Sequence, residues 1–254
     1  MLSACPGGEP VTKLISEAIK DIGYNVLNNF KEAQIDMADY GVPQARKRII
    51  IIGLNKDYYT DSDKVIRKFY KEILPKYKVK EKVTLWDAIK DLPKHFPSDC
   101  EFVHNRRKFS HKFSLNTEEN HLPRYQNKQD IEIFKKLTKD IEEGTGLYKT
   151  SIAKNQLYFE RTGKKTKVHK YHVLEKNKPS TTILAHLYKD GLRFIHPDSK
   201  QARTITVREA ARLQSFGDNY KFISSQGSNF KMIGNAVPPH FSYILSKALE
   251  EILK

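Results

Sequence analysis

Cysteine is scarce in this sequence, and long apolar runs are absent. The 254 residues contain two cysteines, Cys5 and Cys100, which are too few for a disulfide framework and have no metal-ligand spacing near them. No run approaches the ~18 consecutive apolar residues of a membrane-spanning helix. The opening "MLSACPGGEP" also lacks the basic and apolar regions of a secretion signal. We therefore expect a soluble, cytoplasmic protein with reduced cysteines and no metal site or membrane contact.

Acidic residues are also in the minority. Lys+Arg 45 against Asp+Glu 30 gives a formal net charge of +15, which favours a polyanionic partner. Charge alone does not identify that partner, because an AT-rich genome also raises the lysine content. The hydrophobic content of 39% is enough for a core in one large domain or two modest ones.

The first part of the chain combines helical and extended patterns. Apolar residues recur at helical spacing over residues 11–22, and Gly23 follows as a stop. The four isoleucines at 49–52 follow one another without a polar residue, which is typical of a strand covered on both faces. A strand is expected before them in "YNVLNNFKEA", and a polar helix after them from about Ser62 to Leu74.

The end of the chain predicts two helices with clear start signals. Thr206 and Glu209 have the spacing of a capping box, and Gly217 could end the helix that they begin. Pro238 and Pro239 suit the start of a second helix. This second helix carries an apolar stripe that needs a partner surface, formed by Phe241, Ile244, Leu245, Ala248, Leu249 and Ile252.

Three segments together resemble a known family. In order they are "DYGVPQARKRIIIIG", "RTITVREAARLQSFGD" and "GNAVPP", with a variable basic stretch between the first and the second. They resemble the C-terminal motifs of cytosine-5 DNA methyltransferases. The resemblance implies an α/β fold: the C-terminal part of a Rossmann-like methyltransferase sheet with an inserted, loop-rich target-recognition domain. The catalytic part would comprise residues 1–93 and 201–254, with residues 94–200 as the recognition domain.

The N-terminal motifs of that family do not occur in this sequence. They are a glycine-rich cofactor loop, a Pro-Cys loop that carries the nucleophile, and a Glu-Asn-Val segment that contacts the cytosine. Cys5 precedes a proline rather than following one and has no nearby base or cation, so an ordinary loop thiol is expected there. The resemblance thus implies an S-adenosylmethionine pocket that is incomplete in this chain and an N-terminal methyltransferase half or subunit as partner.

The motif "QARKR" explains why cations precede a buried segment. In the family a thiolate adds to C6 of a cytosine rotated out of the duplex, the ring gains negative charge, and S-adenosylmethionine supplies the methyl group. By resemblance Arg48 contacts the flipped cytosine, while Gln44 and Arg46 hold the motif and the nearby DNA backbone. Arginine suits this role because it stays protonated and presents a planar fork of donors. The alternative is a solvated collar of cations beside a buried strand.

Further residues take roles from the same resemblance. Asn235 and Ala236 match the family's position beside the cofactor, although an asparagine can also simply precede a helix. For Arg208 and Arg212, with Glu209 able to pair with Arg212, a surface salt-bridge network is the plain interpretation. Contacts to double-stranded DNA are expected from basic and polar residues that are individually weak candidates, namely Arg106, Arg107, Lys164, Lys165, Thr181, Thr182 and Arg203.

Three functions remain open from the sequence. The chain could be the C-terminal subunit or an excised segment of a DNA (cytosine-5) methyltransferase that is inactive alone. It could instead be a DNA-binding module without catalysis, or an inactive truncated remnant. Because the isoleucine strand would lack part of its cover, self-association of the isolated chain is also expected.

Overall fold

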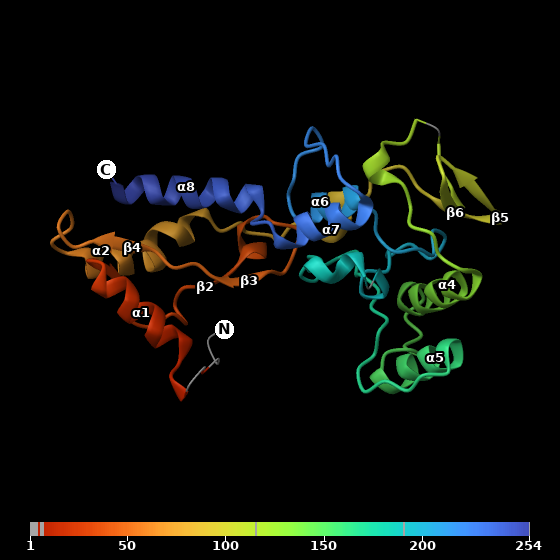
Figure 1. Cartoon of the computed structure of the whole chain (residues 1–254), viewed down its shortest axis with the longest axis horizontal. Helices are drawn as coiled ribbons and strands as arrows, with labels where there is room; N and C mark the ends of the chain where they lie inside the picture. The colour runs from red at the N-terminus through yellow and green to blue at the C-terminus, as the bar shows by residue number, and fades with distance from the viewer. Residues whose placement is uncertain (1–4, 6–7, 115, 190, 254) are drawn as a thin grey trace.

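The computed structural model describes residue 5 and residues 8–114, 116–189 and 191–253. Figure 1 shows an elongated molecule with α1 and the C-terminal end of α8 towards one end and β5, β6 and α5 towards the other. The elements of the first lobe are α1 (Val11–Asp21), β1 (Tyr24–Val26), β2 (Gln34–Asp36), the 3-10 turn η2 (Met37–Tyr40), β3 (Lys47–Ile49), β4 (Gly53–Asn55), α2 (Ser62–Lys68), the π-helical turn η3 (Phe69–Ile73), η4 (Leu74–Tyr77) and α8 (Pro239–Leu253).

Two short antiparallel pairs replace the continuous isoleucine strand that we expected. β1 pairs with β4 and β2 pairs with β3, so the expected strand is interrupted over residues 50–52. There the Tyr70 hydroxyl donates to the Ile50 carbonyl at 2.6 Å and accepts from the Ile52 amide at 3.1 Å. A side chain thus takes the place of a neighbouring strand, and these isoleucines are half-buried rather than covered on both faces.

The C-terminal helix α8 covers the core of this first lobe. Its expected stripe is confirmed in Phe241, Ile244 and Ala248, which are buried against residues of η2, η3 and η4. The Phe241 ring meets Tyr40 edge to face, with 5.5 Å between ring centroids. The helix at the other end of this lobe, α1, is confirmed as well, and Gly23 beyond it has the positive φ that favours glycine.

The basic middle of the chain contains more helix than its weak periodicity predicted. Its elements are β5 (Phe96–His104), β6 (Arg107–Lys112), η5 (Glu119–His121), α4 (Lys128–Glu142), α5 (Ser151–Thr162), η6 (Ala185–Tyr188) and η7 (Gly191–Arg193). Asn127 caps α4 and Thr150 caps α5, each through its side-chain oxygen. The two helices pack on Tyr171, which also contacts Phe134 of α4. The expectation of a loop-rich module is therefore wrong for residues 128–162.

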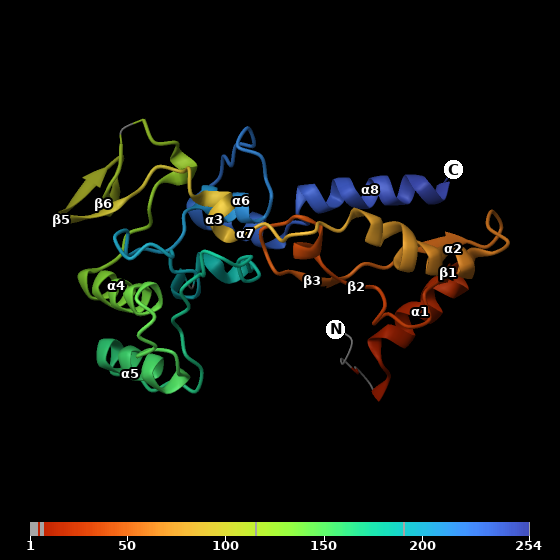
Figure 2. The ribbon, with the colours of Figure 1, turned by 180° about the vertical axis from the view of Figure 1, so that it is seen from behind.

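A second core joins this lobe to the first. It contains α3 (Leu85–Ile89), α6 (Val207–Leu213) and α7 (Gln226–Asn235), together with buried residues such as Ile183 and Phe194. These three helices lie side by side at the centre of the molecule in both views (Figures 1 and 2). The capping box before α6 is confirmed, but the helix ends at Leu213, before Gly217. This core therefore draws residues from all three parts of the sequence.

Two expected absences concern membranes and metals. No helix in the described part of the chain is long and apolar enough to cross a membrane. Among the same residues, no group of three or more His, Cys, Asp and Glu side chains is arranged to hold a metal ion.

Candidate functional site

Gln44 lies in the segment between β2 and β3, where it connects three parts of the chain. Its side-chain oxygen accepts from the Ile183 amide at 2.9 Å, and its side-chain amide donates to the Leu213 carbonyl at 3.2 Å. Residues 43–45 also pair with the backbone of Ser180. Gln44 is fully buried, so these bonds satisfy polar atoms that water cannot reach. The first motif residue therefore holds the backbone of its segment against residues 180–183 and α6.

Arg46 extends the same connection to the end of α7. Its guanidinium donates to the carbonyls of Ile183 at 3.0 Å, Gly234 at 3.1 Å and Ala236 at 3.3 Å. Burial, and next the neighbouring charge of Arg48, lower the pKa of Arg46 to about 10. The side chain nevertheless stays protonated at neutral pH. Arg46 is thus a cationic cross-link among three backbone carbonyls, and we call the structure that it forms with Gln44 the junction.

Gln214 completes the junction, although the sequence did not single it out. Its side-chain amide donates to the carbonyls of Ile233 at 2.8 Å and Ala236 at 3.0 Å, and its oxygen accepts from Gln44. Like Gln44 it has no exposed surface. In the sequence, the role of Gln214 is indicated only by its position directly after the apolar Leu213. That position does not reveal which backbone carbonyls the side-chain amide will bind.

Gly234 allows the backbone of α7 to approach residues 184–185. A Cβ atom on this glycine would lie 2.3 Å from the Ala185 nitrogen and 2.4 Å from the Leu184 carbonyl carbon. Real Cβ atoms essentially never come so close to backbone. The glycine of "GNAVPP" is therefore required by packing at the junction.

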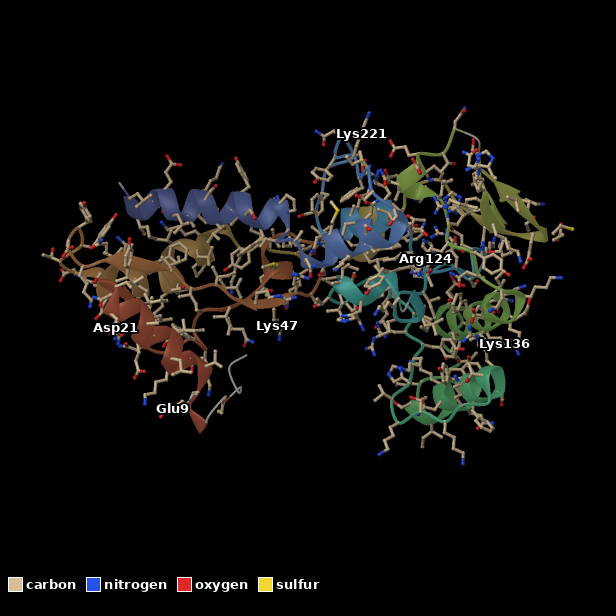
Figure 3. All side chains as sticks on the ribbon, viewed as in Figure 1. Glu9, Asp21, Lys47, Arg124, Lys136 and Lys221 are labelled. Carbon is tan, nitrogen blue, oxygen red and sulfur yellow. The ribbon has the colours of Figure 1, made fainter. Side chains whose placement is uncertain are left out.

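Arg48 differs from the two buried motif residues because it remains accessible. It lies on β3 and is half-buried, and its guanidinium donates to the adjacent Lys47 carbonyl at 2.7 Å. Figure 3 shows the neighbouring Lys47 on the side of β3 opposite α8. Asn235 is exposed at the end of α7, and Thr182 donates its hydroxyl to the Ala45 carbonyl at 2.7 Å. The structure thus brings Gln44, Arg46, Thr182 and Ala236 into one junction, with Arg48 and Asn235 at its surface.

Arg203 does not lie where a DNA contact would require it. Its side chain is 1% exposed, and its guanidinium donates to both carboxylate oxygens of Glu209 at 2.7 and 2.8 Å. The same carboxylate lies 3.4 Å from His196, which is also buried. A bidentate ion pair in the interior leaves no donor for a phosphate or a base. We therefore correct the prediction for Arg203, whose role is to hold α6 in place.

The other two arginines near α6 are also paired differently from the expectation. Glu209 is committed to Arg203, so Arg212 instead pairs with Asp218 and Asp91 at 2.7 and 2.6 Å. Arg208 is buried and donates to backbone carbonyls of the turn after α6. The surface network that we expected is therefore partly an interior one.

Several buried histidines surround the pair formed by Arg203 and Glu209. His121 donates through Nε2 to the Pro93 carbonyl at 2.8 Å, so its Nδ1 accepts from the Thr206 hydroxyl at 2.9 Å. His95 donates through Nε2 to the His121 carbonyl at 2.8 Å. Burial, followed by the charge of Arg203, lowers the pKa of His95 and of His196 to about 3. Burial also lowers the pKa of His111 to about 4. All of these rings are therefore neutral in the folded protein at physiological pH.

We expect this arrangement to make the protein sensitive to mild acid. Because the folded pKa values lie below the ordinary value of about 6.5, the unfolded chain binds more protons between about pH 6.5 and pH 3. The stabilisation is complete above pH 6.5 and is lost as pH falls. With three such histidines, the free energy of unfolding should drop by about 3–4 kcal/mol per pH unit near pH 5.5. Urea denaturation followed by circular dichroism from pH 7.5 to pH 5 would measure this, and a flat profile would contradict it.

The remaining DNA-contact candidates lie away from the junction. Arg106 is exposed at the tip of the β5–β6 hairpin, where it and Asn105 have the positive φ values of a tight two-residue turn. Lys164 and Lys165 are exposed directly after α5, and Thr181 is exposed beside the junction. The hairpin and α5 belong to the lobe opposite α1 (Figure 2). These side chains are accessible, but they are not gathered around Arg48.

Comparison with known proteins identifies the family to which this chain belongs. A family model described as C-5 cytosine-specific DNA methylase matches residues 7–251. The chain belongs to this family. The match runs through the junction and both lobes, so the family is not assigned on the short motifs alone.

Curated relatives of this chain are longer than the chain itself. A type II methyltransferase of Bacillus paralicheniformis is 31% identical, with 94% of this chain and 56% of the relative covered. A type II methyltransferase of a Psychrobacter species is 29% identical, with 97% and 51% covered. The crystal structure of a prophage-encoded candidate DNA modification methyltransferase (E. coli) has the same fold, with a TM-score of 0.54, 22% identity, and 95% and 65% covered. The chain thus spans about half to two thirds of the length of these proteins.

The C-5 cytosine-specific DNA methylase family uses S-adenosylmethionine as its methyl donor. Asn235 and Val237 are exposed at the end of α7, beside the backbone that Arg46 holds. The glycine-rich loop that would receive the cofactor does not occur in the sequence.

Proposed function

We propose that this chain acts as the C-terminal part of a DNA (cytosine-5) methyltransferase. In this proposal they supply target recognition and the arginine that contacts the flipped cytosine, while an N-terminal half supplies the cysteine nucleophile and most of the cofactor pocket. The observation that carries the proposal is a difference in burial among the residues of "QARKR". Gln44 and Arg46 are buried in the junction, whereas Arg48 is left accessible on β3.

The junction would act by fixing the position of Arg48. A guanidinium that is held beside the cytosine stabilises the negative charge that develops on the ring after nucleophilic attack at C6. Such stabilisation is effective only if the donor is in place before the reaction, because reorganisation at the time of reaction would cost free energy. Gln44, Arg46 and Gln214 would provide this through bonds to backbone on three segments, at Ile183, at Leu213 and over residues 233–236. S-adenosylmethionine, when bound, supplies the methyl group, and Asn235 and Ala236 would line part of its pocket.

The lobe built from residues 94–200 would bind double-stranded DNA. Arg106, Arg107, Lys164 and Lys165 are proposed to contact phosphates, and Thr181 and Thr182 to lie near base edges. Thr182 already fixes the position of its backbone relative to the motif segment, through its bond to the Ala45 carbonyl. A recognition segment and Arg48 would therefore be positioned by the same junction.

The test is methyl transfer with and without the missing half. We expect no transfer from radiolabelled S-adenosylmethionine to DNA by the rigorously purified chain, because it encodes no Pro-Cys nucleophile. Transfer should appear when an N-terminal methyltransferase half carrying the glycine-rich, Pro-Cys and Glu-Asn-Val segments is added. Light scattering of the same samples would show whether the isolated chain self-associates and whether addition of the N-terminal half dissociates these assemblies.

The outcomes separate the three functions. Transfer by the chain alone would disprove the division of the active site that we propose. DNA binding without transfer in any mixture would favour a recognition module without catalysis. Absence of both binding and transfer would favour an inactive remnant.

A further inference from the structure

Positive charge is concentrated along α5 and the segment after it. Between residues 149 and 172 the sequence has seven Lys and Arg residues and one acidic residue, Glu160. Of the seven cations, Arg161 is paired with Asp130 at 2.6 Å. The six lysines make no ion pair with any residue that the structure describes, and they are Lys149, Lys154, Lys164, Lys165, Lys167 and Lys170. This part of the surface therefore has an unbalanced positive charge.

A cavity of about 440 Å³ opens among these residues. It lies between the C-terminal end of α4, the loop that leads to α5, and residues 171–178. Cationic or titratable side chains on its wall are Lys149, Lys154, His172 and Lys178, and apolar side chains such as Leu137 and Val173 form another part. A cavity with an apolar wall and a cationic rim suits a sugar attached to a phosphate.

The two acidic groups beside the cavity are already engaged. The Asp140 carboxylate accepts from the backbone amides of Leu147 and Tyr148 and from the Thr145 hydroxyl, so it is directed into its own loop. Glu175 is paired with Lys178 at 2.7 Å. Among the described residues, Lys149 and Lys154 form no ion pair, although the charge of Lys154 contributes to the lowered pKa of Asp140.

His172 reports the electrostatics of this region. Its amide donates to the Leu192 carbonyl at 2.9 Å, which brings the exposed Arg193 close to the cavity. Burial, and then the charges of Lys154, Arg193 and His169, lower the pKa of His172, with Glu175 as the opposing charge. Two permanent cations, Lys154 on α5 and Arg193 on η7, therefore act on one half-buried ring. An anion bound among them would relieve this repulsion.

Residues 171–178, which form part of the cavity wall, belong to the segment that follows α5. In both views residues 163–178 run along the side of α4 and α5 that is turned towards α1 and β3 (Figures 1 and 2). Arg48 lies on β3. DNA held at Arg48 could therefore continue towards this cavity without passing around the lobe.

We propose that this cavity binds a phosphodiester of the DNA backbone outside the target sequence, with Lys154 and Arg193 as its principal cations. The inference rests on the proposed function, because it takes the partner of the chain to be double-stranded DNA. It adds a contact that carries no sequence information and lengthens the stretch of DNA that the protein covers. His172 would gain a proton when the phosphate binds.

Salt dependence of DNA binding tests this inference. Fluorescence anisotropy with a labelled duplex of about 25 base pairs, at 50 to 300 mM salt, gives the slope of log Kd against log salt. The double variant Lys154→Gln/Arg193→Gln should reduce that slope by about 1, since one phosphate contact is lost and each contact contributes about 0.9. The matched control, Lys64→Gln/Arg67→Gln, removes two exposed cations from α2 at the far end of the first lobe and should leave the slope unchanged.

Duplex length and pH distinguish the backbone of DNA from a free anion. With a duplex of about 10 base pairs the variant and the unaltered chain should bind alike, because the outlying phosphate is missing. With the long duplex, binding should tighten several-fold from pH 7.5 to pH 6, since His172 takes up a proton, and His172→Gln should remove this tightening. If inorganic phosphate binds at the cavity and duplex length has no effect, the site takes a free anion and our inference is wrong.

Failure of the inference is separable from failure of the proposed function. If the unaltered chain does not bind DNA at all, the proposed function fails. If it binds DNA but the variant has the same slope as the control, with both folded by circular dichroism, only the phosphate site is disproved.

Discussion

Replacing Gly234 with alanine is expected to destabilise the protein more than the same replacement at any other glycine in a described helix. The new Cβ would overlap backbone atoms of Leu184 and Ala185, which cannot rotate away as a side chain would. Relief requires α7 to move from η6, which would also break the bonds of Arg46 to Gly234 and Ala236. We expect a loss of about 3 kcal/mol, at the upper end for overpacking. Thermal unfolding should shift down by about 6–12 °C.

A second glycine in the same helix provides the control. A Cβ on Gly227 would meet the Tyr188 side chain at 3.8 Å, which is an ordinary contact. Alanine there should stabilise the protein by about 0.5–1 kcal/mol, because glycine disfavours the helical backbone. If the two variants unfold at the same temperature, the close approach at Gly234 is not a determinant of stability.

Replacing Arg48 with alanine should lower turnover by about 100-fold or more in the reconstituted methyltransferase, while DNA affinity changes by less than about threefold. Removal of one preorganised donor from a developing negative charge typically costs 10² to 10³ in rate. The folded structure should persist, because the hydrogen bond of the Arg48 guanidinium goes to the carbonyl of the adjacent Lys47 and does not connect β3 to a distant segment. Single-turnover methyl transfer at saturating DNA measures the rate, and anisotropy measures the affinity.

Two further variants show whether position and shape matter in addition to charge. Lys47 is exposed and adjacent on β3, so its side chain points to the opposite face of the strand. Lys47→Ala should therefore leave turnover near its original value. Arg48→Lys keeps the charge but loses the planar fork, and should recover only part of the rate. Equal losses in turnover and DNA affinity for Arg48→Ala would reduce its role to DNA binding.

Elements with local start signals could be predicted from the sequence. The capping box of Thr206 and Glu209 fixes the start of α6, and the glycine after α1 adopts the left-handed conformation that ends a helix. The stripe on α8 is also local, since its spacing alone identifies the buried face. Such signals depend on neighbouring residues and do not require knowledge of the fold.

The errors arose where distant residues determined the local structure. Four isoleucines predicted a continuous strand, but Tyr70 occupies the hydrogen-bonding position of a neighbouring strand beside Ile50 and Ile52. Arg203 was expected on DNA because it is basic and lies near a motif. Arg203 can be buried because the Glu209 carboxylate accepts hydrogen bonds from both of its terminal nitrogens. The spacing of the two residues in the sequence did not reveal this pairing.

The candidate site was recovered in part for the same reason. The motif gave Gln44, Arg46 and Arg48 by resemblance, but not the separation into two buried residues and one accessible residue. That separation depends on the carbonyls of Ile183 and Gly234, which lie far away in the chain. Gln214 was missed because its partners also come from distant segments.

The junction has a consequence for the kinetics of folding. Its bonds join residues that are 137, 169 and 188 positions apart in the chain. Contacts of such high contact order form slowly, because loop closure has an entropic cost before any contact can form. During synthesis at about 5–20 residues per second, Arg46 would wait roughly ten seconds or more for Gly234 to emerge. Until then the Arg46 guanidinium lacks part of the carbonyl acceptors that it has in the folded protein. Structure formed earlier in the nascent chain therefore depends on local elements such as α4 and α5.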